Sequence, residues 1–362
     1  MYPGPSEPDY GAFIATMCAA MERQGHEVDR VVIDSRASGA LSTPRKYVNL
    51  ARRAVPAAKR ADVIYGHYLF PTGAIAAAAG RIAKRPWVLT AHGGDVRNLS
   101  SPTIARLSTP GITGASAIIA VSRYLATELR ESARALPPVH VIDMGVDMDR
   151  FRPSDRGAAR RAHGLPDDVP VILAVGGLNE RKNPLRLLQA FRLLQSRHPR
   201  ARLVFVGAGP QEAALRAGVR LEGLGDAVIL TGALPAAGVA EWMAACDLLA
   251  LPSRVEPLGV VALEALASGR PVVATRIGGT AEVVGRAGVL VDPYDPRSIA
   301  DGITRVLARP PSVAQCRTTA EGHDVNRQAR RVLDILERAA RDHTGGTVPG
   351  ATASTTGRPY DP

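Results

Sequence analysis

Cysteine and long apolar runs are both scarce in this chain. Three cysteines occur among 362 residues, at Cys18, Cys246 and Cys316. An odd number of widely spaced cysteines argues against a disulfide framework and is typical of reduced thiols in the cytosol. No apolar run reaches the roughly 18 residues that a membrane-spanning helix needs. The first residues also lack the basic start and apolar block of a secretory signal. We therefore expect a cytoplasmic protein.

Aromatic residues make up only 4% of the chain, and one stretch lacks acidic residues altogether. No recognised nucleic-acid motif accompanies the net charge of +11, so we do not expect nucleic-acid binding. Residues 35–61 contain no Asp or Glu but seven cations: Arg36, Arg45, Lys46, Arg52, Arg53, Lys59 and Arg60. This stretch predicts either a peripheral contact with an anionic membrane, at the inner face of the plasma membrane, or guidance of an anionic acceptor. The alternative is a solvated helix face.

Short apolar strands alternate with amphipathic helices, which indicates an α/β fold with parallel sheets. At this length we expect two domains. The predicted units are an acceptor-side domain at 1–150, a linker at 151–169, a donor domain at 170–318, a C-terminal helix at 319–343 and a disordered tail at 344–362. Strands are predicted at 28–33, 63–65, 87–90, 117–121, 139–142, 171–175, 202–206, 228–231, 248–251, 271–275 and 288–291.

The start of the first domain departs from a doubly wound sheet, in which a strand precedes the first loop and helix. Here a Pro/Gly loop at residues 3–11 leads directly into a predicted helix at 12–24. We expect the natural chain to begin upstream by about one strand and its lead-in.

Two glutamates, Glu256 and Glu264, lie eight residues apart around Gly259 and the start of an apolar helix. One carboxylate falls in the loop before the helix and the other about two turns inside it. Between them lie the free N–H groups of a helix N-terminus, which suit a phosphate. This spacing fits a nucleotide-sugar; the alternative is a buried loop–helix junction with incidental glutamates.

Lys182 follows a strand and a Gly turn, just before a helix opened by Pro184. Open α/β sheets bind ligands at this edge, where an ammonium group suits a diphosphate. Arg181 is a second candidate, and a surface Arg–Lys pair is the alternative. Gly207 and Gly209 follow the next strand and offer bare backbone to a base or ribose, although this pattern taken alone favours an ordinary tight turn.

His92 follows a strand in the first half, and we expect it to point into any cleft between the domains; the alternative is a structural histidine. Tyr65 to Tyr68 occupy another strand end that could meet an acceptor. Asp147 and Asp149 are spaced like a metal-binding Asp pair, but they precede the linker, so we interpret them as turn and capping residues. We expect no metal site.

Taken in order, these motifs resemble those of the retaining glycosyltransferases of family 4. The similarity runs from about Tyr2 to about Leu307, and its motifs are residues 25–28, 92–95, 145–151, 180–182, 206–210, 256–264 and 278–282. It implies the GT-B fold, in which two Rossmann-like doubly wound domains face a central cleft. It also implies a hexosyltransferase that moves a sugar from a UDP- or GDP-linked donor to a hydroxyl acceptor without metal or cofactor; lipid-linked and polysaccharide acceptors are among those the family uses.

The resemblance also implies residue roles. Glu256 would contact donor-sugar hydroxyls, Glu264 the ribose hydroxyls, Lys182 the diphosphate, and His92 the transferred sugar. Further donor contacts would come from Gly11, Arg181, Gly207, Gly209, Leu234, Leu258, Gly259 and Val260. The chain has Gly177 where the family often has an arginine, so that phosphate contact is either missing or supplied by Arg181 or Arg254. The other hypotheses are a nucleotide-sugar epimerase of the same fold, whose acid/base carboxylates we do not find, and an inactive nucleotide-sugar binding protein.

Overall fold

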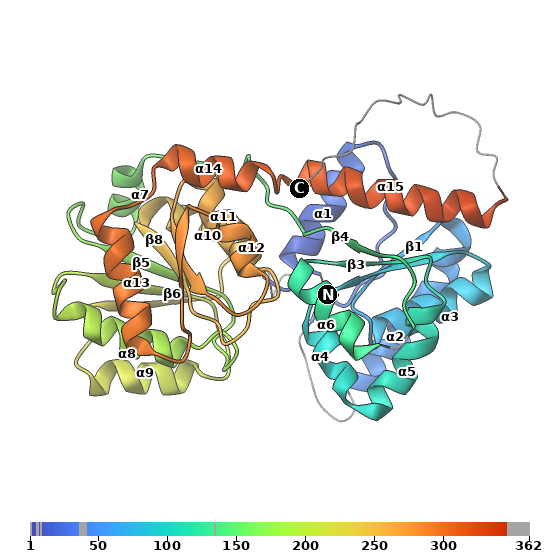
Figure 1. Ribbon diagram of the computed structural model, residues 1–362, viewed down its shortest axis with the longest axis horizontal. Coiled ribbons are helices and arrows are strands. Elements are labelled where there is room, and N and C mark those ends of the chain that lie inside the picture. The colour runs from blue at the N-terminus through green and yellow to red at the C-terminus, as the bar shows by residue number, and fades with distance from the viewer. Residues whose placement is uncertain (1, 5–6, 8, 36–41, 134, 346–362) are drawn as a thin grey trace.

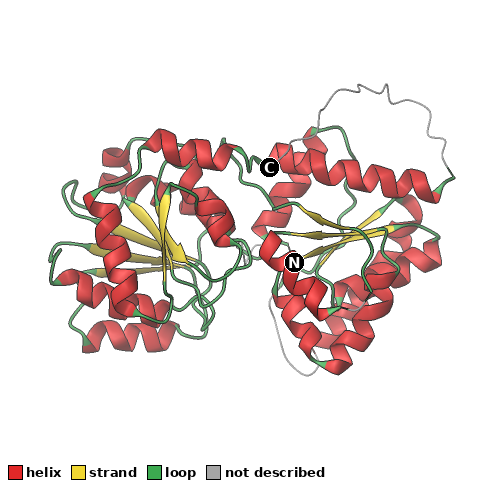
Figure 2. Ribbon diagram, in the orientation of Figure 1, coloured by secondary structure: helices red, strands yellow, loops and turns green. Residues whose placement is uncertain are grey.

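The computed structural model describes residues 2–4, 7, 9–35, 42–133 and 135–345. Two parallel sheets organise these residues into two α/β bodies (Figures 1 and 2). The first body runs from helix α1 to strand β4 and also includes helix α15, and the second body runs from α7 to α14. Each sheet is covered by helices on both faces, as parallel sheets require.

The first sheet has the order β1-β2-β3-β4. Its strands are β1 (Ile64–His67), β2 (Trp87–Ala91), β3 (Ala117–Ala120) and β4 (Val139–Val141). All residues of β2 and β3 are buried. The helices of this body are α1 (Ala12–Arg23), α2 (Ser42–Arg60), α3 (Thr72–Ala83), α4 (Gly94–Arg97), α5 (Pro102–Thr113), α6 (Arg123–Ser132) and α15 (Val325–His343), with a 3-10 turn at Asn98–Ser100.

The second sheet has the order β10-β9-β8-β5-β6-β7. Its strands are β5 (Val171–Val175), β6 (Arg202–Val206), β7 (Val228–Gly232), β8 (Leu248–Leu251), β9 (Val272–Thr275) and β10 (Gly288–Val291). Its helices are α7 (Arg156–Ala162), α8 (Pro184–Gln195), α9 (Glu212–Leu221), α10 (Ala236–Ala245), α11 (Val260–Ala267), α12 (Thr280–Val284), α13 (Pro296–Ala308) and α14 (Val313–Glu321). The strand order reverses between β5 and β8, and ligands bind at such a switch point in doubly wound folds.

Ten of the eleven predicted strands are present, and the prediction at 28–33 is wrong. Residues 26–35 are described without a strand. A strand exists through ladder hydrogen bonds with a neighbour, and β1 forms the edge of the first sheet among the described residues. Ile33 is nevertheless buried, which explains the apolar pattern that suggested a strand. The expected upstream strand stays a prediction.

The predicted linker at 151–169 contains α7, which packs against α10. Arg160 fixes it: this buried side chain donates to the Ala245 and Asp167 carbonyls and pairs with Asp247. The segment therefore packs as part of the second body. The predicted helix at 319–343 is two helices, α14 and α15, that meet at residues 322–324. Of the predicted tail, residues 346–362 lie outside the described part of the chain.

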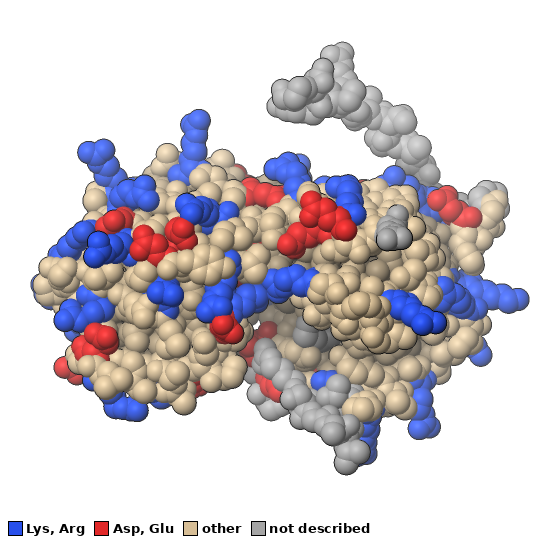
Figure 3. Space-filling view, turned by 60° about the horizontal axis from the view of Figure 1, so that its bottom comes forward, with Lys and Arg blue, Asp and Glu red and all other residues tan. Residues whose placement is uncertain are grey.

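The chain crosses between the bodies twice, and the two crossings pair with each other. Val146 and Asp324 form a parallel bridge, in which the Val146 N–H donates to His323 O and the Val325 N–H donates to Val146 O. After this crossing, α15 returns to the first body and packs on α1 (Figure 1). The surface is hollowed where the two bodies meet (Figure 3).

Candidate active site

A buried charge cluster lies at the switch point of the second sheet. Lys182 follows β5 and Glu256 follows β8, and the Lys182 Nζ lies 2.6 Å from Glu256 Oε2. The same oxygen accepts a hydrogen bond from Ser253 Oγ at 2.9 Å, and Arg181 approaches both carboxylate oxygens at 3.4 Å. Burial alone would raise the pKa of Glu256, but Lys182 and Arg181 outweigh it and lower that pKa. Glu256 is therefore an ionised carboxylate.

The start of α11 lies beside this cluster, as the spacing of the two glutamates predicted. Gly259 is the N-cap in a left-handed conformation, and Leu258 and Gly259 are buried. The first N–H groups of a helix have no partner in a preceding turn and are suited to an anion, although here the Ala262 N–H donates to Gly259 O. Glu264 lies farther along α11, half-buried; burial raises its pKa to about 7, against the opposing effects of Arg150 and Lys182.

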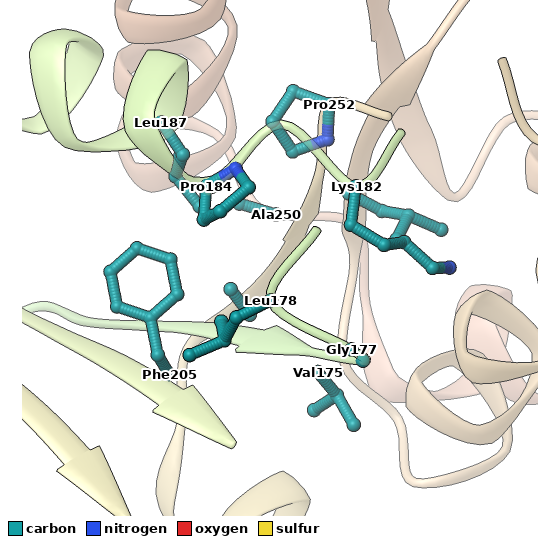
Figure 4. A pocket seen from close by; sticks show the side chains of 12 residues that line it. Val175, Gly177, Leu178, Lys182, Pro184, Leu187, Phe205, Ala250 and Pro252 are labelled. Atoms are coloured by element: carbon teal, nitrogen blue, oxygen red, sulfur yellow. The ribbon is translucent and has the colours of Figure 1, made fainter. Parts of the chain in front are cut away.

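The strand-end turns beside Lys182 pack against each other through bare backbone. A Cβ on Gly207 would lie 2.0 Å from Gly176 O, and one on Gly209 would lie 2.4 Å from Leu178 O. This packing alone accounts for both glycines, so their part in donor binding stays a prediction. Beside the turn after β5 is a depression lined by Gly176, Gly177, Lys182 and apolar side chains of α8, β6 and the end of β8. The Lys182 ammonium points away from the apolar group around Phe205 and Leu187 (Figure 4).

His92 belongs to the first body, and its turn touches the loop that carries Glu256. A Cβ on Gly93 would lie 2.3 Å from Pro257 Cγ. The His92 Nε2 lies 3.1 Å from His67 Nδ1, with the rings of Phe13 and Tyr68 nearby. Burial lowers the pKa of both histidines, that of His67 to about 3, so both rings are neutral. The structure therefore places the His92 turn against the loop that carries Glu256. The expected role of His92 in the cleft stays a prediction.

The positions of Gly11 and Leu234 do not test their predicted role in donor binding. Gly11 is the N-cap of α1 in a left-handed conformation, and Leu234 lies half-buried in the loop between β7 and α10. Arg254 is exposed and pairs with Glu180, whereas Arg181 faces Glu256, so Arg181 is the better placed to substitute for the arginine absent at position 177.

Sequence reasoning assigned no role to two residues that position the site. Asp95 is buried, and its carboxylate accepts hydrogen bonds from the N–H groups of His92, Gly93 and Leu69. It therefore holds the His92 turn against the turn that carries His67. Asn183 Nδ2 donates to the carbonyls of Pro252 and Pro293 and so fixes the Lys182 turn to the end of β8. The sequence held a signal for each: Asp95 ends the motif at residues 92–95, and Asn183 directly follows Lys182.

Two protein-family models match this chain, one over each body. A model described as Glycosyltransferase Family 4 matches residues 11–150, and one described as Glycosyl transferases group 1 matches residues 155–323. D-inositol 3-phosphate glycosyltransferase 2 of Catenulispora acidiphila is 34% identical over 311 residues, which is 78% of this chain and 71% of that protein. D-inositol 3-phosphate glycosyltransferase of Thermobispora bispora is 35% identical over 323 residues, 80% of this chain and 73% of that protein.

The chain belongs to glycosyltransferase family 4. It is a glycosyltransferase that moves a sugar from a nucleotide-sugar to an acceptor. This assignment favours transfer over the epimerase and binding-protein hypotheses.

Solved structures of similar fold support the GT-B architecture predicted for this glycosyltransferase. HepE from Anabaena superposes with a TM-score of 0.76 at 23% identity, covering 91% of this chain and 96% of HepE. Sucrose-phosphate synthase from Thermosynechococcus elongatus gives 0.67 at 24% identity, covering 95% and 94%. The predicted fold of two Rossmann-like domains facing a cleft is confirmed.

Two further findings concern the described residues alone. They hold no group of three or more His, Cys, Asp or Glu side chains arranged to bind a metal ion. Asp147 Oδ1 instead accepts from the N–H groups of Asp149 and Arg150, which is the turn and capping role predicted for it. None of their helices combines the length and apolarity required to cross a bilayer.

Proposed function

We propose that this glycosyltransferase takes a UDP- or GDP-linked hexose and transfers the sugar, with retention and without a metal, to a hydroxyl of an anionic acceptor. The carrying observation is the pairing of Lys182 with Glu256 across the β5/β8 switch point, beside the start of α11. These groups offer one ammonium, one carboxylate and free N–H donors at the edge of the sheet where doubly wound folds bind nucleotides. HepE, similar in fold, is described in complex with UDP and glucose.

In the proposed mechanism the protein acts electrostatically. The sugar–phosphate bond breaks toward an oxocarbenium-like state, and the Lys182 ammonium and the N–H groups from Leu258 to Val260 stabilise the departing diphosphate. Glu256 holds hydroxyls of the donor sugar and Glu264 those of the ribose, while Gly207, Gly209, Leu234 and Gly11 line the rest of the donor site. The acceptor hydroxyl attacks from the face that the diphosphate leaves, and its proton passes to the leaving phosphate. His92 contacts the transferred sugar from the opposite body.

The acceptor proposal rests on charge. Two relatives are named for D-inositol 3-phosphate, an anionic acceptor. Helix α2 has no acidic residue and carries the exposed cations Arg45, Arg52, Arg53, Lys59 and Arg60; Arg36 of the predicted stretch lies outside the described residues. We include in the proposal a peripheral contact of α2 with anionic lipid, which would bring the enzyme to the inner face of the plasma membrane and to a lipid-linked acceptor.

Thermal stability measured against UDP, GDP and ADP, each with and without Mg²⁺, tests the donor assignment. A bound nucleotide stabilises the folded state by mass action. We expect a shift with UDP or GDP that is unchanged by Mg²⁺ and is lost in Lys182→Met. A shift that requires Mg²⁺ would contradict the metal-free mechanism, and no shift with any nucleotide would contradict the donor site.

Vesicle co-sedimentation tests the membrane contact. Changing Arg45, Lys46, Arg52 and Arg53 to Ser removes four cations, each worth about 1 kcal/mol near an anionic surface, so binding to phosphatidylglycerol vesicles should weaken roughly a thousandfold. The matched control changes four exposed cations of the second body, Arg192, Arg197, Arg200 and Arg216, to Ser. Equal binding by the two variants would remove α2 from the proposal.

A further inference from the structure

Glu282 reaches from the second body to the first. Its Oε1 accepts a hydrogen bond from the Tyr124 N–H at 2.8 Å and its Oε2 accepts one from the Arg123 N–H at 3.0 Å. The carboxylate is 23% exposed, whereas the Arg123 side chain is 79% exposed and only 3.5 Å from it at closest approach. The backbone donors, not the guanidinium, therefore define this contact.

The contact completes the N-terminus of α6. A helix begins with N–H groups that have no partner within it. Ser122 Oγ accepts from the third of these, on Leu125, while Glu282 accepts from the first two, on Arg123 and Tyr124. The Ser122 hydroxyl also donates to Pro257 O at 2.6 Å, again in the other body. The capping carboxylate of this helix thus comes from the opposite side of the cleft, where it also faces the positive end of the helix dipole.

The segment that precedes Glu282, residues 277–279, is hydrogen-bonded to the backbone of Glu256 in the proposed donor site. The Gly279 N–H donates to Glu256 O at 2.9 Å and the Glu256 N–H donates to Ile277 O at 3.1 Å. A Cβ on Gly279 would lie 2.1 Å from Pro257 O and 2.6 Å from Ser122 Cβ, so three segments meet where only glycine fits. The backbone of Glu256, whose side chain binds Lys182, is therefore two hydrogen bonds away from the cap on α6.

We propose that Glu282 is a positioning residue that holds the two bodies closed, with the His92 turn against the Glu256 loop. Through this contact, Glu282 couples binding of the donor sugar at Glu256 to the closed arrangement, in which residues of both bodies contact the sugar. This inference rests on the proposed function for its catalytic meaning, but the contact itself is a property of the unliganded chain. Closure of this kind excludes water from the reacting sugar and completes the site.

The first readout is the distance between the bodies without any ligand. Fluorophores are placed at Thr103→Cys in the first body and Ser196→Cys in the second, both exposed positions, in a Cys18→Ser background; Cys246 and Cys316 are buried. We expect Glu282→Ala to lower and broaden the energy-transfer efficiency, and Glu282→Gln, which keeps one acceptor oxygen, to fall between Ala and the unchanged chain. Glu241→Ala, an exposed glutamate on α10, is the matched control and should leave the efficiency unchanged.

The second readout separates positioning from folding. We expect Glu282→Ala to lower kcat/KM for transfer about tenfold or more and to raise the ratio of donor hydrolysis to transfer, while the Kd for UDP or GDP stays within about twofold. Unchanged energy transfer in Glu282→Ala would overturn the proposal, as would a nucleotide Kd that rises by the same factor as kcat/KM falls. Failure of the unsubstituted enzyme to bind nucleotide would instead refute the proposed function, and the distance measurement would still judge Glu282.

Discussion

At the residue scale, Lys182 and Glu256 form a buried ion pair at the proposed donor site. Their 2.6 Å contact leaves the lysine stem at 16% exposure and the carboxylate at 7%. In the proposed mechanism an entering diphosphate shares Lys182 with Glu256, while Glu256 keeps Arg181 and Ser253 as partners. The ion pair holds the Lys182 ammonium in a defined position before a donor binds. This limits how far the side chain must move when negative charge develops on the diphosphate.

Lys182→Met should lower kcat/KM more than a comparable substitution at an exposed position of α8. Loss of one charged hydrogen bond, worth roughly 1.5–3 kcal/mol, predicts a 10- to 150-fold fall in kcat/KM. It also leaves Glu256 buried with fewer partners, so the free energy of unfolding should fall. Adding Glu256→Gln should recover that stability but not activity, as measured by urea unfolding and sugar transfer. Arg192→Met, an exposed position on α8, is the control. Full activity in Lys182→Met would contradict the assigned role.

Glu264 should make donor binding depend on pH. Burial raises its pKa from an ordinary 4.5 to about 7, so the carboxyl is protonated in the folded enzyme below neutrality. Nucleotide affinity should rise with pH through about 7 and then level, because the ionised form is the stronger acceptor for ribose hydroxyls. Calorimetric titrations at pH 6 and pH 8 check this, and Glu264→Gln should give a weaker, pH-independent affinity.

The same group affects stability with the opposite sign. Between pH 4.5 and 7 the folded state binds more protons at Glu264 than the unfolded state, so its contribution to stability falls as pH rises through that window. The difference in Tm between the unchanged enzyme and Glu264→Gln should therefore shift in favour of the Gln variant from pH 5 to pH 8. A constant difference in Tm would show that the pKa of Glu264 in the folded enzyme is not raised into this pH range.

At the element scale, the two strand-end turns after β5 and β6 act as one unit. Gly207 has φ of 146° and faces Gly176 O so closely that any side chain forces the turns apart. Gly207→Ala should lower the free energy of unfolding by about 1–3 kcal/mol. Gly225→Ala, with nothing within 4 Å of the added Cβ, should stay within about 0.5 kcal/mol. Urea denaturation distinguishes them; equal effects would mean that the turns separate without cost.

Apolar strands bounded by Gly and Pro were predictable because burial on both faces produces continuous runs such as Val171–Val175. A helix in the basic stretch was considered only as an alternative and without bounds, because Pro44, Pro56 and the dense cations of α2 obscure the helical period. The placement of Glu256 before α11 and of Glu264 within it was predictable because the spacing along the chain sets it. Contacts between remote residues were not predictable: Glu282 and Tyr124 lie 158 positions apart, and Asp95 and Leu69 lie 26 apart.

At the scale of the whole molecule, α15 belongs to the first body although it follows the second in sequence. Its buried face includes Val325, Ala329, Val332, Leu333 and Leu336, and it packs on α1. A chain ending at Gly322 should lose the cooperative unfolding of the first body and aggregate on heating, because this face of the core would meet water. A chain ending at Gly345 keeps every described element and should retain its Tm. Calorimetry of the two checks this, and equal transitions would show that α15 is dispensable.

The return of α15 also sets the order in which the enzyme is finished on the ribosome. Arg23 donates to Asn326 Oδ1 across 303 positions of sequence. At roughly 5–20 residues per second, α1 leaves the ribosome about 15 to 60 s before the helix that covers it is synthesised. Residues 155–323 emerge complete within that interval. The second body is therefore synthesised in full first, and the first body keeps one flank of its core uncovered until α15 emerges.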